Sequence, residues 1–179
     1  GITHTSLGFL EKALLFFEQL NQLFEELYAS SPENVSSKKK LAISYQFLGN
    51  THASLGNLEK ALFFFEQFNQ LLEVLYASSP ENVSFKKGLA ISYEKLGETY
   101  ASLGNLEKTL IFFEQLNQLE KELHKAYPEN VSFKNGLAIS YEKLGDTHTS
   151  LGNLDKASSF FEQSNQLEKE LHESYPENV

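Results

Sequence analysis

Apolar residues recur along the chain every three or four positions, the spacing that places side chains on one face of an α-helix. In residues 80–127 they form two series: Val83, Leu89, Ala90, Tyr93, Leu96 and Tyr100, and then Leu106, Leu110, Phe113, Leu116, Leu119 and Leu123. No segment shows the period-two alternation that is typical of a half-buried strand. The pattern therefore predicts two helices of about 20 residues, each roughly 30 Å long, and an all-α fold.

Both predicted helices are bounded by residues that cap or stop a helix. Asn82 is a good N-cap, because its side-chain oxygen can accept a hydrogen bond from the first turn. Gly104 is typical of the position just past a helix C-terminus, and Asn105 follows it directly as the next N-cap. The second helix should stop at Tyr127, since Pro128 disfavours helical geometry in its predecessor. A tight turn at Gly104 is therefore expected to join the two helices.

The same pattern returns at a fixed interval along the chain, without an insertion or a deletion. Two sets of residues show this 48-residue period: Pro32, Pro80, Pro128 and Pro176, and Gly8, Gly56, Gly104 and Gly152. Residues 49–96 and 97–144 are identical at 35 of 48 positions. Stacked helical repeats share a core with their neighbours. We therefore expect one repeat array over residues 1–179, a fragment of a longer chain, with units at about 1–31 (partial), 32–79, 80–127 and 128–175 and the start of another at 176–179.

The repeated residues resemble those of the tetratricopeptide repeat (TPR) family. One unit carries the family pattern at Tyr93, Leu96, Gly97, Tyr100, Gly104, Leu106 and Phe113. The preceding unit carries it at Tyr45, Leu48, Gly49, His52, Gly56, Leu58, Ala61 and Phe65. The resemblance covers the whole chain. It implies a right-handed α-solenoid of stacked antiparallel helix pairs that acts as a scaffold for protein–protein interaction.

Each unit is longer than the usual unit of this family, which has about 34 residues. The separations from Phe65 to Pro80 and from Pro80 to Tyr93 each exceed the family pattern by seven residues. Seven residues are close to two helical turns, so an added segment drifts by only about 20° and keeps the same faces inward. Leu75 and Val83 continue the apolar stripe within the added segments. The longer helices are thus expected to pack like shorter ones.

In this family the first helix of each unit lines a concave groove that holds a peptide or a partner helix. The matching positions here are Gln46, Asn50 and Ser54 in one unit, Glu94, Glu98 and Ser102 in the next, and Glu142, Asp146 and Ser150 in the last. Chaperone-binding members hold a C-terminal carboxylate there with Lys, Arg and Asn. This chain carries mostly amide and acidic groups instead, so the comparison implies a basic or polar partner segment. A merely solvated helix face, balanced by Lys95 and Lys143, is the alternative.

A second candidate surface lies on the second helix of each unit. Leu15, Phe63 and Ile111 each precede a pair of phenylalanines, which makes three successive apolar positions. Three such positions span about 200° of a helix, so one of them should face outward. An exposed stripe of this kind would suit self-association into a homo-oligomer. Wider burial against neighbouring units is the alternative.

Two polar residue types also recur in register. His4, His52 and His148 share a slot that Tyr100 fills in another unit, and slots of successive units lie about 10 Å apart, too far to share one metal ion. We expect structural roles for these histidines and no metal site. The second helices carry Asn21, Asn69, Asn117 and Asn165. These asparagines either form a buried polar ladder between helices or lie in solvent.

Composition narrows the range of functions. The net charge is −9 and the 15 basic residues are all lysine, which disfavours nucleic acid because arginine is the usual residue for gripping phosphates. Cysteine is absent, so disulfides and thiol chemistry are excluded. No apolar run approaches the roughly 20 residues of a membrane span. The composition suits a cytoplasmic, bacterial protein.

No catalytic or phosphate-binding motif is present, so we predict neither enzyme activity nor a cofactor. The leading hypothesis is a protein-interaction scaffold whose groove receives a peptide or helix. One alternative is a structural element that self-assembles through its repeat ends or through the stripe of Leu15, Phe63 and Ile111. Another is a regulatory arm of a larger multidomain protein.

Overall fold

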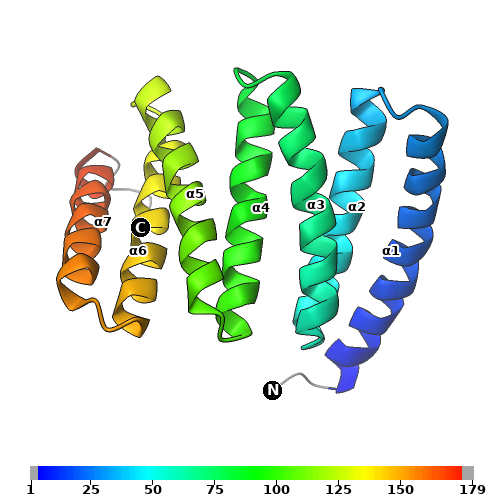
Figure 1. Cartoon of the computed structure of the whole chain (residues 1–179), viewed down its shortest axis with the longest axis horizontal. Helices are drawn as coiled ribbons and strands as arrows, with labels where there is room; N and C mark the ends of the chain where they lie inside the picture. Colours follow the sequence, from blue (N-terminus) through cyan, green and yellow to red (C-terminus); the bar gives the residue numbers. More distant parts are fainter. Residues whose placement is uncertain (1–3, 175–179) are drawn as a thin grey trace. The chain divides into compact units, whose positions relative to one another are not determined.

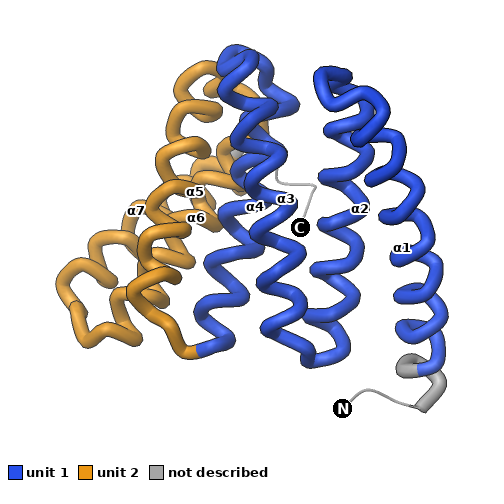
Figure 2. Tube along the Cα trace, turned by 45° about the vertical axis from the view of Figure 1, so that its right-hand side comes forward, with its two compact units in different colours: residues 1–103 blue, residues 104–179 orange. Residues whose placement is uncertain are grey.

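The computed structural model of the chain describes residues 4–174, and their side chains from Gly8 to Glu173. These residues form seven α-helices and no strand (Figure 1). They divide into two compact units, residues 1–103 and residues 104–179 (Figure 2). Unit 1 contains α1 (His4–Ser30), α2 (Val35–Ser54), α3 (Leu58–Ser78) and α4 (Val83–Ser102); unit 2 contains α5 (Leu106–Ala126), α6 (Val131–Ser150) and α7 (Leu154–Ser174). The expected start of a further repeat at residues 176–179 lies outside the described residues.

The helix ends form as their sequences predict. The Asn82 side chain accepts hydrogen bonds from the backbone N–H groups of Ser84 and Phe85 at the start of α4. Gly56, Gly104 and Gly152 have φ angles of 77°, 76° and 76°, in the left-handed region that favours glycine. These caps and turns leave α2 to α7 at 20 or 21 residues each. The antiparallel helix pairs and the all-α class are thereby confirmed.

The first helix departs from this pattern. α1 is a continuous helix of 27 residues that passes through Gly8, where the repeat period would place a turn. At Gly56 the turn joins two full-length helices that pack against each other. The turn that the repeat pattern predicts at Gly8 is therefore not observed, because the helix continues through this residue.

One close contact brings the two helices of a pair together. Gly49 of α2 lies against the ring of Phe65 of α3, so near that a Cβ atom at position 49 would be 2.5 Å from a ring carbon. In unit 2, a Cβ atom at Gly145 of α6 would lie 2.6 Å from the ring of Phe161 of α7. Real Cβ atoms do not come so close to a ring, because dense packing leaves no slack. Glycine is therefore required where these helices approach.

The seven-residue extensions keep their phase with the rest of each helix. Leu75, near the C-terminal end of α3, is 1% exposed, and Leu41, near the N-terminal end of α2, is 3% exposed. Leu89 and Leu137, which repeat the position of Leu41, are buried as well. The added residues thus lengthen the packed face of each helix without rotating it.

A recurrent hydrogen bond joins the second helix of one repeat to the first helix of the next. Ser44 donates to Asn21 at 2.8 Å, Ser92 donates to Asn69 at 2.8 Å, and Asn117 donates to Ser140 at 2.8 Å. The three serines are fully buried, Asn21 and Asn117 are buried, and Asn69 is half-buried. These three asparagines therefore form a polar ladder between helices. Asn165 is exposed, which agrees with the alternative that an asparagine at this position lies in solvent.

Substitution of Ser44 by alanine tests this ladder. Ser44→Ala removes the donor to Asn21 and leaves a buried amide oxygen without its partner, which should lower the free energy of unfolding by about 1–3 kcal/mol. Urea denaturation followed by circular dichroism measures the change. Ser36→Ala, at an exposed position of the same helix, is the matched control and should change the value by less than about 0.5 kcal/mol. Equal effects of the two substitutions would contradict a stabilising role for the ladder.

Candidate partner-binding groove

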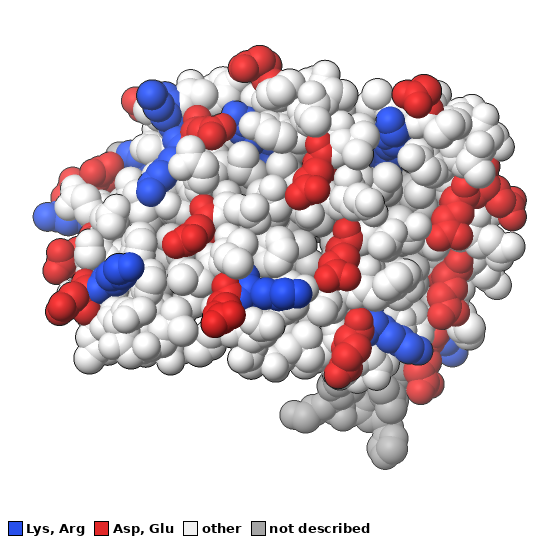
Figure 3. Space-filling view, viewed as in Figure 1, with Lys and Arg blue, Asp and Glu red and all other residues white. Residues whose placement is uncertain are grey.

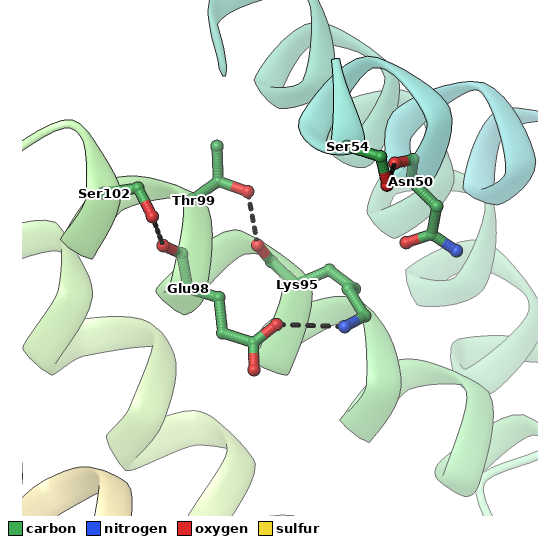
Figure 4. A network of polar contacts seen from close by, with 6 residues as sticks. All are labelled: Asn50, Ser54, Lys95, Glu98, Thr99 and Ser102. Carbon is green, nitrogen blue, oxygen red and sulfur yellow. Dashed lines mark hydrogen bonds and ion pairs between the residues drawn. The ribbon is translucent and has the colours of Figure 1, made fainter. Parts of the chain in front are cut away.

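α2 and α4, the first helices of two successive repeats in unit 1, border a hollow of about 540 Å³. α2 and α4 form its two walls, and α3 provides its floor through Leu58 and Phe65. The α2 wall consists of Asn50, Ala53 and Ser54, and the α4 wall consists of Lys95, Glu98, Thr99 and Ser102. Figure 4 shows the polar residues of the two walls on either side of this space. The hollow thus combines an apolar floor with a polar rim.

The rim is held by short local contacts. Lys95 Nζ lies 2.9 Å from Glu98 Oε2, and the Ser102 hydroxyl donates to the Glu98 carbonyl oxygen at 2.9 Å. On the opposite wall, the Ser54 hydroxyl donates to the Asn50 carbonyl oxygen at 2.9 Å. The Lys95–Glu98 ion pair is partly exposed, and such pairs contribute only about 0–1 kcal/mol. A partner's charged group can therefore displace either member at small cost.

Four of the groove residues predicted from the sequence line this hollow: Asn50, Ser54, Glu98 and Ser102. Gln46 and Glu94 lie half-buried on the same two helices, outside the lining. In unit 2, the structure places Glu142, Asp146 and Ser150 on the exposed face of α6. Their partner-binding role stays a prediction.

Each first helix also exposes an isoleucine at one recurring position, which was not predicted as part of the site. Ile43, Ile91 and Ile139 are 43%, 38% and 37% exposed. Each lies seven residues before the groove position occupied by Asn50, Glu98 or Asp146, so each shares that residue's side of the helix. Recurrence of an isoleucine outside the buried stripe of each first helix was the signal available in the sequence.

The second helices expose the predicted apolar stripe. Leu15, Phe63 and Ile111 are 62%, 54% and 53% exposed, so the alternative of wider burial does not hold for them. Acidic side chains gather over α1 and α3 on the face seen in Figure 3. On each of these helices three exposed glutamates lie seven residues apart, at Glu11, Glu18 and Glu25 and at Glu59, Glu66 and Glu73. The stripe therefore lies in acidic surroundings.

The shared histidine slot is part of the core. His52 stacks on Phe64 with ring centroids 5.5 Å apart, and His148 stacks on Phe160 at the same distance. Tyr100, in the equivalent slot of α4, donates to Glu66 at 3.0 Å. Burial lowers the pKa of His52 below its ordinary value of 6.5, and the positive charge of Lys60 lowers it further. Among the described residues, the buried Nδ1 of His52 has no hydrogen-bond partner, which agrees with a neutral ring.

Residues 4–174 contain neither a metal-binding cluster nor a membrane-spanning helix. No group of three or more His, Cys, Asp or Glu side chains there is arranged to hold a metal ion. None of the helices in that range has both the length and the apolar character needed to cross a membrane.

The chain is similar to known repeat proteins. The tetratricopeptide repeat family model matches residues 42–71 and 138–170, which identifies these segments as tetratricopeptide repeats and confirms the family resemblance. Proteins built from such repeats are generally non-catalytic, and the match supports a protein-interaction scaffold. No curated protein sequence matches the chain significantly.

One solved structure shares the fold at low sequence identity. BtubC from P. vanneervenii superposes with a TM-score of 0.71 at 17% identity, over 94% of this chain and 60% of BtubC. This chain therefore spans less than two thirds of that protein. MamA gives a TM-score of 0.49 at 18% identity, over 86% of this chain and 90% of MamA. Because the sequence identity to BtubC is so low, that likeness shows the fold alone.

The buried histidine makes stability depend on pH. Because the pKa of His52 is lower in the folded chain than in the unfolded chain, the unfolded state binds more protons as the pH falls below about 6.5. The stabilising contribution of neutral His52 is present above that pH and is lost as the pH falls towards the folded pKa. His52→Tyr, which copies the slot of Tyr100, should reduce the fall in Tm between about pH 7.5 and pH 5.5. An unchanged fall would exclude His52 as its source.

Proposed function

We propose that the chain is a protein-interaction scaffold that binds a basic or polar segment of a partner protein on the exposed face of its first helices. The hollow between α2 and α4 carries the proposal, because an apolar floor with a few convergent polar groups is typical of a binding site. Asn50 and Ser54 on one wall and Glu98 and Ser102 on the other would make the polar contacts. Asp146 repeats the Glu98 position on α6 of unit 2 and would offer a partner the same acidic group there.

Electrostatics support the chemistry proposed for the partner. The rim offers amide, hydroxyl and carboxylate oxygens, which accept hydrogen bonds from lysine or arginine side chains. Glu98 forms a partly exposed ion pair with Lys95, so a cation from the partner can take the place of that lysine beside the carboxylate. Opposite charges across an interface raise the association rate and favour the correct partner.

Charge reversal on the groove face tests this function. Glu98→Lys combined with Asp146→Lys should abolish capture of the partner from the native lysate, because it places like charge against a basic segment. Affinity pull-down with quantitative mass spectrometry measures the loss. Glu59→Lys combined with Asp155→Lys reverses one glutamate and one aspartate on second helices and is the matched control. Capture that survives the groove variant as well as it survives the control would refute the groove model.

A second candidate function is self-association through the stripe of Leu15, Phe63 and Ile111. The exposure of all three residues supports it, since exposed apolar side chains often belong to an interface. The glutamates beside the stripe would repel those of a second copy. Screening by salt should therefore strengthen this association.

Sedimentation velocity tests self-association. Phe63→Ser should lower the fraction of oligomer, and salt at about 0.5 M should raise that fraction relative to about 0.05 M. Leu154→Ser, at an exposed leucine outside the stripe, should leave the distribution unchanged. A wild-type chain that stays monomeric at every concentration and salt level would remove this candidate.

A further inference from the structure

The exposed face of the first helices in unit 1 carries three rows of different chemistry. Lys39 and Lys87 form a basic row, Ile43 and Ile91 form an apolar row, and Asn50 and Glu98 form an amide and acidic row. On each helix the three residues are separated by four and then seven positions, close to one and two full turns. They therefore share one side of the helix.

The rows of α2 and α4 lie side by side. Towards one end of the helices, Lys39 Nζ lies 5.7 Å from the centroid of the Phe85 ring. Towards the other end, Asn50 and Glu98 line the same hollow. α2 and α4 are both antiparallel to α3, so they run in the same direction (Figure 1). Each row thus continues from α2 to α4.

The dimensions of this face fit a helix better than an extended strand. Eleven residues separate Lys39 from Asn50, so the two outer rows lie about 16 Å apart along the helix axis. A helix with its side chains is about 10–12 Å across, and the side chains of the two outer rows close the remaining gap. A single strand occupies only about 5 Å in its sheet, which is too narrow to reach both rows at once.

We infer that this face binds an amphipathic α-helix of the partner, lying across α2 and α4, with one acidic flank and one basic flank. This inference rests on the proposed function and specifies the ligand of the same groove. The apolar stripe of the partner covers Ile43 and Ile91, its acidic flank faces Lys39 and Lys87, and its basic flank faces Asn50 and Glu98.

The two outer rows also set the direction of the bound helix. Turning an amphipathic helix end for end exchanges its flanks while its apolar stripe stays down. A partner with exchanged flanks therefore binds in the opposite direction rather than failing to bind. A partner whose two flanks carry the same charge meets an unfavourable row in either direction. Weaker binding of such a partner than of a mixed-flank partner therefore distinguishes this inference from non-specific apolar binding.

Synthetic peptides test the inference directly. The probe is a fluorescein-labelled, leucine-striped peptide of about 18 residues, enough for about five helical turns, with one glutamate flank and one lysine flank. It is titrated with the full chain at low salt, and binding is followed by fluorescence anisotropy. Comparison peptides carry two glutamate flanks, two lysine flanks, glutamine in place of the leucine stripe, or a central proline that breaks the helix. The mixed-flank helical peptide should bind at least about tenfold more tightly than each of them.

Variants of the chain assign the contacts. Ile43→Ser with Ile91→Ser should weaken the mixed-flank peptide at least about tenfold. Lys39→Glu with Lys87→Glu should weaken it similarly and should strengthen binding of the peptide with two lysine flanks. Lys12→Glu with Lys60→Glu makes the same charge change at exposed positions of α1 and α3 and should alter binding less than about twofold. All these positions are exposed or nearly so, and the Tm of each variant checks that the fold persists.

Two results would overturn the inference. One is equal binding of the mixed-flank peptide and the proline peptide, which would indicate an extended ligand. The other is an effect of Lys39→Glu with Lys87→Glu no larger than that of the Lys12 and Lys60 control. If partner capture is still lost on charge reversal at Glu98 and Asp146, the groove function stands and only the helical ligand is wrong. If the mixed-flank peptide binds no more tightly than the comparison peptides, and the Glu98 and Asp146 variant still captures the partner, both the helical ligand and the groove function are wrong.

Discussion

The approach of Gly49 to the ring of Phe65 is the contact on which the rest of unit 1 depends. Because glycine has no Cβ, α2 can lie directly on the phenyl ring, and the turn at Gly56 then closes the pair. The same ring forms part of the floor of the hollow between α2 and α4. Core packing and the shape of the candidate binding site are therefore set by one contact. The equivalent contact of Gly145 with Phe161 builds the pair α6–α7 in unit 2.

A different kind of interaction connects successive pairs. The apolar contacts between pairs are non-directional and would tolerate small slips along the helix axis. The hydrogen bond between Asn21 and Ser44, repeated by Asn69 with Ser92, needs both partners at one position. A slip would leave a buried polar group without its partner, which costs more than the bond contributes when it is made. The ladder thus fixes where each groove residue stands relative to those of the neighbouring helix.

Much of the fold could be predicted because local residues determine it. Asn82 caps a helix and Gly104 follows one for reasons that lie within a few positions of each. The burial of Asn117 depends on its contact with Ser140 of α6, a neighbour that local sequence does not reveal. In the site, Asn50, Ser54, Glu98 and Ser102 follow from their repeat positions. The role of Phe65 in the floor of the hollow does not follow from its repeat position, because it depends on how closely α2 approaches α3. The exposure of Ile91 depends on which helices leave that side of α4 uncovered.

The phase of the extensions has a consequence for repeats of this kind. Leu41 and Leu75 pack as ordinary core residues although they lie in added segments. A helix pair can therefore be lengthened or shortened by seven residues per helix while the same residues still meet across it. The length of the helices can then change without changing how successive helix pairs stack. The lysine row at positions 39 and 87 lies in the added turns of α2 and α4. Helices of standard length would therefore present a shorter exposed face, with the apolar row and the amide and acidic row but without the basic row.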